Sequence, residues 1–140
     1  MITTNYIPLE KETETVSFND DDLDLTGRYI VSFTYKGTKH EVERWSYMLI
    51  QLCKILYSEN PIQMNSLAAN NCWLHDRNYY NNNSNKLDLV AENCYVFTSC
   101  STKTKCSIIS YIFEQLGINP SDLEFELRPM SDKTDTETNE

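Results

Sequence analysis

The stretch from Ser99 to Lys105 holds the residues of this chain best suited to bind an anion. If a helix begins there, its free N–H groups, nearby hydroxyls and two lysines would converge at the positive end of the helix dipole. Arg77, in the preceding loop, could approach the same place. The candidate anion-binding residues are Ser101, Thr102, Lys103 and Lys105. We favour an ordinary capped helix with solvated lysines, because the glycines of a phosphate-binding loop are absent. Binding of nucleic acid or a nucleotide through residues 99–105 is the alternative function.

Cysteine and histidine are the other residues that could carry chemistry. Cys72 and His75 have the spacing of a metal-ligand pair, but a second close pair, which zinc sites normally show, is absent. Cysteine–histidine catalysis needs a thiol, an imidazole and an orienting group in register, and no local signature marks them. We therefore predict no metal, no cofactor, no catalytic residue and no enzymatic activity. The five cysteines should be reduced, with Cys53 a small core hydrophobe.

The net charge of −9 is concentrated at the two ends of the 140-residue chain. Residues 9–24 hold seven acids and one base, and residues 129–140 hold four acids and one base. Such segments are typically solvated tails. The alternative is that an acidic end occupies a basic groove of a nucleic-acid-handling partner, in the place of phosphates. The candidate partner-binding residues here are Asp20, Asp21, Asp22 and Asp24.

The elements that must position these residues follow from hydrophobic periodicity. Residues 43–58 predict a central amphipathic helix with an apolar stripe at helical spacing. Two β runs, residues 28–35 and 39–43, precede it as a hairpin in which Gly37 would take a positive φ. Asn60-Pro61 ends the helix, and a short second helix follows. The stripe of the central helix consists of Trp45, Met48, Leu49, Leu52, Ile55 and Leu56.

The second half of the chain predicts a brief strand near Cys72–His75, a strand at residues 94–98, a last helix and a final strand at residues 123–128. The last helix should end at Gly117 as its C′ residue. Residues 77–86 are rich in asparagine and tyrosine and should form an exposed loop. Aromatic residues in polar loops are good protein-contact anchors, and the candidates are Arg77, Tyr79 and Tyr80.

These elements predict an α+β fold, in which an antiparallel sheet, made of the opening hairpin and later strands, packs against two main helices. Residues 1–24 should be an acidic, largely irregular segment, with room for a short strand around Val16 and Phe18. A single α+β domain should span residues 25–128, and residues 129–140 should be a disordered acidic tail. No stretch of about 18 apolar residues and no signal peptide is recognisable, so a cytoplasmic protein is expected.

Two motifs resemble a small α+β module of phages, mobile elements and bacterial defence systems. One is the hairpin leading into a tryptophan-led helix that ends in LY…NP, here Trp45 to Pro61. The other is a YV.T strand that leads through a Ser/Thr-rich turn to a helix closing on LGI, here Tyr95 to Ile118. The resemblance covers residues 27–128 and supplies no active-site residues.

The resemblance implies a role in phage–host conflict, and a phage-encoded inhibitor such as an anti-CRISPR would fit a small chain without catalytic machinery. The expected function is therefore non-enzymatic protein binding. The partner would be a nucleic-acid-targeting defence complex, inhibited in the host cytoplasm. The body of the chain, with ten acids and ten bases, makes direct nucleic-acid binding the weaker expectation.

Overall fold

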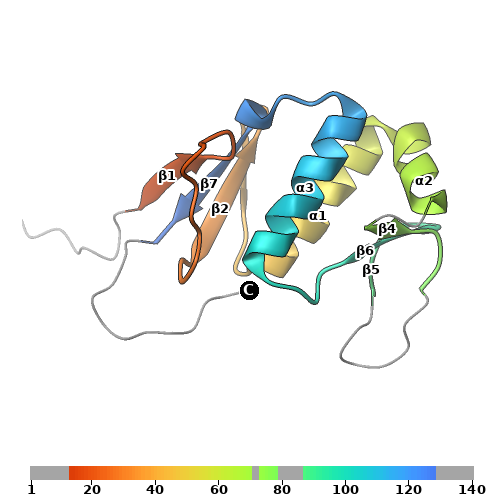
Figure 1. The fold of residues 1–140 in the computed structure, drawn as a ribbon, viewed down its shortest axis with the longest axis horizontal. Coiled ribbons are helices and arrows are strands. Elements are labelled where there is room, and N and C mark those ends of the chain that lie inside the picture. Colours follow the sequence, from red (N-terminus) through yellow and green to blue (C-terminus); the bar gives the residue numbers. More distant parts are fainter. Residues whose placement is uncertain (1–12, 71–72, 79–86, 129–140) are drawn as a thin grey trace, which may run out of the picture.

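The structure is a computed structural model that describes residues 13–70, 73–78 and 87–128. It has the predicted α+β fold, with helices packed on antiparallel strands (Figure 1). In chain order the elements are β1 (Glu14–Ser17), β2 (Ile30–Tyr35), β3 (Thr38–Glu41), α1 (Trp45–Glu59), α2 (Pro61–Ala69), β4 (Leu74–His75), β5 (Leu87–Ala91), β6 (Cys94–Phe97), α3 (Thr102–Leu116), the 3₁₀ turn η2 (Pro120–Asp122) and β7 (Leu123–Leu127).

The described strands form two sheets, where the sequence analysis expected one. Sheet A has the order β1-β7-β2-β3, and sheet B has the order β4-β6-β5. All their pairings are antiparallel. Sheet B contains β5, which the sequence analysis missed. It pairs with β6 through a tight turn in which Asn93 has a φ of 63°, a conformation that asparagine tolerates.

Helix α1 is the central element, as its periodicity predicted. In Figure 1, α1 and α3 run side by side between sheet A and sheet B. Helix α1 packs against β2 of sheet A, against β5 of sheet B and against both other helices. Ile55, at the border of the predicted stripe, is only half-buried. The buried residues of α1 are Trp45, Met48, Leu49, Leu52, Cys53 and Leu56.

Trp45 fixes the start of α1 on sheet A. Its side chain is fully buried, and its Nε1 donates a hydrogen bond to the backbone oxygen of Arg28 at 3.0 Å. Its ring meets the edge of Phe125 on β7, with 5.1 Å between ring centroids. A buried indole needs both an apolar neighbourhood and an acceptor for its N–H, and this position supplies both.

The described part of the acidic N-terminal segment, from Thr13, contributes a short strand to sheet A, close to the strand expected around Val16 and Phe18. Strand β1 pairs with β7 along the edge of sheet A. Glu14 of β1 forms an ion pair with Arg28, with 2.6 Å between Oε1 and Nη2. Phe18 packs edge-on against Phe113 and Phe125, each at 5.9 Å between centroids. The few apolar residues of this segment therefore decide its placement. The predicted tail at residues 129–140 lies outside the described residues.

Two glycines adopt the backbone conformations that the sequence predicted. Gly37 has a φ of 86° in the β2–β3 hairpin loop, next to Lys36 at 50°. Such a pair of positive φ values matches the right-handed twist of the strands on either side. Gly117 ends α3 with a φ of 71°, and its N–H bonds to the carbonyl of Glu114. That is the left-handed helix end that glycine adopts without steric cost.

A single carboxylate links three strands of sheet A and the residue before β1, on the face turned away from the helices. Glu126 of β7 accepts hydrogen bonds from Ser32 of β2 at 2.6 Å and from Thr13, next to β1, at 2.5 Å. Lys39 of β3 forms an ion pair with Glu126 at 3.1 Å. These three donors, Ser32 first, lower the pKa of Glu126 to about 2.

We expect Leu52→Ala to lower the free energy of unfolding by about 2–5 kcal/mol, because it opens a cavity where α1 is fully buried. Urea unfolding followed by circular dichroism measures this change. Lys54→Ala, two residues away on the exposed side of α1, is the control and should change stability by less than about 0.5 kcal/mol. Similar losses in both variants would contradict the central position of α1.

We expect Glu126→Gln to destabilise the fold by about 1–2 kcal/mol at neutral pH, since hydrogen bonds to a partly exposed charge are lost. The folded-state pKa lies below the ordinary value of 4.5, so this stabilisation is complete above pH 4.5 and is lost as the pH falls toward 2. Urea midpoints at several pH values measure it, and the wild-type and variant curves should converge in acid. Glu124→Gln, an exposed neighbour on the same strand, should leave the difference between pH 7 and pH 3 close to that of the wild type.

Candidate functional site

The predicted anion-binding turn is an ordinary capped helix start. Ser101 is the N-cap of α3, and its Oγ accepts a hydrogen bond from the N–H of Thr104 at 3.1 Å. The Ser101 hydroxyl also lies 3.1 Å from the Thr104 hydroxyl. Thr102 is buried in the first turn of the helix. The cap already uses the hydroxyl that an anion would need, which agrees with the interpretation favoured from the sequence.

Lys105 is not the solvated lysine that the sequence predicted. Its side chain is only 1% exposed, and its Nζ donates a hydrogen bond to the backbone oxygen of Cys100 at 2.5 Å. The amine therefore closes the turn that leads into α3. Lys103 is the exposed lysine of this turn. It adds to the lowering of the pKa of Asp24, which comes mainly from hydrogen bonds donated by Thr26.

The predicted partner-binding aspartates are exposed on the turns between β1 and β2. Two of them organise the backbone there: Asp20 Oδ1 accepts from the N–H of Asp22 at 3.0 Å, and Asp24 Oδ1 accepts from the N–H of Thr26 at 3.1 Å. Their negative charge faces solvent. The turn that carries Asp20, Asp21, Asp22 and Asp24 is therefore an ordered acidic surface.

Arg77 belongs to a different part of the molecule from the aspartates. It follows β4 of sheet B, whereas the acidic turn follows β1 of sheet A (Figure 1). Its side chain is exposed, with Nε 3.6 Å from Oδ1 of Asp76. The predicted contacts Tyr79 and Tyr80 lie outside the described residues. The predicted partner-binding residues that the structure describes thus form two separate groups.

The four described cysteines form no disulfide among themselves, and burial makes three of them poor nucleophiles. Burial raises the pKa of the Cys94 thiol to about 11. Burial also raises that of Cys106 to about 11, against the opposing charge of Lys105. Cys53 is fully buried, as predicted, and burial raises its pKa as well. The thiolate is the reactive form, so these thiols are unreactive at neutral pH.

His75 shows the same influence of burial. Burial lowers the pKa of its imidazole, although the neighbouring Asp76 raises it. Within residues 13–70, 73–78 and 87–128, no three His, Cys, Asp or Glu side chains are grouped so that they could hold a metal ion. Cys72, the other half of the predicted ligand pair, lies outside the described residues.

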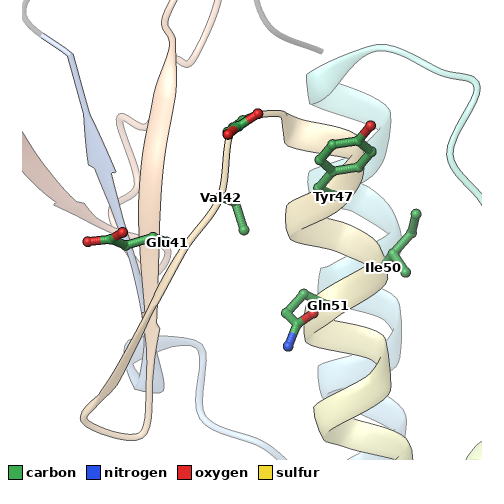
Figure 2. Close-up of a pocket in the computed structure, with 6 residues that line it drawn as sticks. Glu41, Val42, Tyr47, Ile50 and Gln51 are labelled. Carbon is green, nitrogen blue, oxygen red and sulfur yellow. The ribbon is translucent and has the colours of Figure 1, made fainter.

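A groove of about 470 Å³ lies where β3 leads into α1. We call it the β3–α1 groove. In Figure 2, the side chains of Val42 and Gln51 point into the space between the strand and the helix, while Glu41 points away from α1. The lining residues are Glu41, Val42, Glu43, Tyr47, Ile50 and Gln51.

The geometry of the groove follows from the chain's register. The N–H of Val42 donates to the backbone oxygen of Val31 at 3.2 Å, which keeps the chain on sheet A until just before the helix. Because Trp45 anchors the start of α1, Tyr47, Ile50 and Gln51 are held on one flank of that helix, opposite Val42. Residues at i, i+3 and i+4 share one helix face.

Tyr47 is the most prominent apolar side chain of the groove. It is 52% exposed, and the guanidinium of Arg44 lies 5.8 Å from the centre of its ring. The sequence analysis did not predict a groove at this place. The spacing of Tyr47, Ile50 and Gln51 was the available signal, but the opposite wall depends on how β3 meets the helix.

Sheet B presents a second apolar surface. Leu89, 55% exposed, is the cross-strand partner of Tyr95 on β6, so both side chains lie on one face. The buried Val96 points to the opposite face, toward the core.

We expect Lys105→Met to lower the free energy of unfolding by about 1–3 kcal/mol, because the backbone oxygen of Cys100 loses a donor within a buried turn. Lys103→Met, the same substitution at an exposed site two residues earlier, should be nearly neutral. Thermal unfolding of both variants makes the comparison. Equal stabilities would show that the amine of Lys105 does not support the turn.

Comparisons with models of known protein families, with curated proteins and with solved structures found no match to this chain. Of the helices that the structure describes, none combines the length and apolar character needed to cross a membrane. The resemblance noted in the sequence therefore stays an expectation, and the function has to be argued from the surfaces themselves.

Proposed function

We propose that this chain is a non-enzymatic protein-binding protein that contacts its partner through the β3–α1 groove. The observation that carries the proposal is the half-exposed Tyr47 beside a groove of about 470 Å³ that also has half-buried Val42 and Ile50 in its walls. Tyrosine at the rim of a preformed groove is the kind of residue that dominates binding energy at protein interfaces. It combines large contact area with few rotatable bonds.

The titratable groups support binding rather than catalysis. The thiols of Cys94 and Cys106 have raised pKa values of about 11. The imidazole of His75 has a lowered pKa. A nucleophilic thiol needs the reverse arrangement, a lowered thiol pKa beside a cation or a general base. No cysteine or histidine is found among the described residues that line the groove.

As the biological setting we propose inhibition of a nucleic-acid-targeting defence complex by a phage or mobile-element protein of the anti-CRISPR type, within the host cytoplasm. The exposed aspartates of the turn at residues 20–24 and the net charge of −9 support it. Proteins that handle nucleic acid present basic channels, and an acidic protein surface is attracted to them as phosphates are. The acidic turn would steer the encounter, and the groove would supply the contact.

Nucleotide binding at residues 99–105 has less support. Ser101 serves as a helix cap, and Lys105 is buried with its amine bonded to the Cys100 backbone. Lys103 remains as the exposed cation of that turn, beside the carboxylate of Asp24. A single lysine facing a carboxylate is a weak site for a phosphate.

The test is a plaque assay on a panel of bacterial strains, each with one active class of RNA-guided defence complex. In the strain whose complex is the target, expression of the wild-type protein should restore plaques of a targeted phage. Tyr47→Ala should reduce that restoration at least about tenfold, as the loss of an interface anchor does. Ile62→Ala, which removes an 80% exposed side chain of α2 outside the groove, is the matched control and should act like the wild type.

Two results would contradict the proposal in different ways. Restoration in no strain of the panel would rule out the setting. Restoration that Tyr47→Ala and Ile62→Ala leave equally intact would rule out the groove as the contact surface.

A further inference from the structure

We propose that the occupant of the β3–α1 groove is an extended basic segment of the partner, which adds to sheet A as an antiparallel strand beside β3. This inference rests on the proposed function and names the class of partner segment for the same site. It follows from the hydrogen-bonding pattern of β3, from the way its last residues line the groove, and from the charge of that lining.

Among the strands that the structure describes, β3 ends the order β1-β7-β2-β3, so one of its edges is paired and the other is open. Tyr35 and Thr38 pair across the two-residue hairpin loop. Four residues after Thr38, the N–H of Val42 donates a hydrogen bond to the backbone oxygen of Val31. In an antiparallel ladder the residues bonded to the neighbouring strand alternate with residues whose N–H and C=O point the other way. The main-chain groups of Lys39 and Glu41 therefore point to the open edge.

Glu41 contributes its backbone to the groove. It belongs to the lining, yet its side chain points away from α1 in Figure 2. The alternation of the strand explains this, since Glu41 pairs with Ser32 and shares the outer face of sheet A with it. The groove thus combines an open strand edge with the apolar side chains of Val42 and Ile50, an arrangement that can receive a peptide in extended form.

The side-chain preferences of such a peptide follow from the same geometry. A residue directly opposite Glu41 would form a hydrogen-bonded pair with it and would place its side chain beside the Glu41 carboxylate. Its neighbours on either side would point toward Val42 and Ile50. Of the described residues, those that line the groove include two carboxylates, Glu41 and Glu43, and no base. Apolar residues alternating with lysine or arginine therefore match the groove.

A second copy of this chain matches the groove less well. Each copy carries a net charge of −9, and pairing two β3 strands would bring two acidic linings together. Strand β3 is also short and carries Lys39 and Glu41, as protected edges commonly do. Lys39 is held by Glu126 at 3.1 Å, so the cation at this edge is already engaged.

The experiment is an NMR titration of the full-length protein with the blocked peptide Val-Lys-Val-Lys-Val-Ser-Val, which places its lysines opposite Glu43 and Glu41 and its serine opposite Lys39. Binding should slow amide hydrogen exchange at Lys39 and Glu41 at least about tenfold, because new hydrogen bonds form there. Glu41→Lys should weaken binding by roughly two- to fivefold, as the loss of a cross-strand charge pair does. Glu114→Lys, an exposed charge change on α3, is the control and should leave affinity nearly unchanged.

Backbone methylation of the peptide tests the strand pairing itself. In antiparallel addition, the lysine and serine N–H groups face β3 and the interior valine N–H groups face away. N-methylation at lysine and serine should abolish binding, and N-methylation at the interior valines should preserve it. Strand addition would be overturned if the two methylated peptides bound equally well, or if only methylation at valine abolished binding. It would also be overturned if the parent peptide did not bind. The plaque assay with Tyr47→Ala is independent of these results, so either proposal can fail alone.

Discussion

The burial of one face of α1 is the constraint on which the rest of this structure depends. Helix α1 contacts β2 of sheet A and β5 of sheet B, as well as α2 and α3. Its six buried side chains, from Trp45 to Leu56, contribute roughly 10 kcal/mol of transfer free energy in total. That figure is similar to the whole stability of a typical domain. The two sheets therefore cannot separate from α1 without unfolding of the core.

The burial of this face of α1 also fixes the position of the β3–α1 groove. Because Trp45 is fixed by its ring contact with Phe125 and by its hydrogen bond to Arg28, the first turns of α1 cannot rotate. The flank that carries Tyr47 and Ile50 is then held beside Val42 at the end of sheet A. A binding site on rigid elements loses little conformational entropy when a partner binds. The buried residues of α1 thus hold its exposed residues in a fixed position for binding.

Hydrophobic periodicity predicted the features that neighbouring residues determine. It missed the features that depend on contacts between residues far apart in the sequence. The stripe of α1, a capped start of α3 and its end at Gly117 are set by neighbouring residues, and the sequence predicted them, although it did not single out Ser101 as the cap. The pairing of β1 with β7 joins residues more than a hundred positions apart. The seven acids in residues 9–24 instead favoured the prediction of a solvated tail. The groove was missed for the same reason, because one of its walls comes from the strand and the other from the helix.

Lys105 shows that one of these errors was avoidable. It precedes Ile108, Ile109 and Ile112 at spacings of three, four and seven residues, so it lies on the buried stripe of α3. A lysine on such a stripe buries its aliphatic stem and needs an acceptor for its amine, which the Cys100 carbonyl provides. The apparent cationic site at residues 99–105 is for that reason a structural turn. Near the groove, Lys39 forms an ion pair with Glu126, whereas Glu41 is exposed on the outer face of sheet A. The acidic lining and the edge of β3 that no described strand pairs with therefore favour an extended, positively charged segment over a nucleic acid.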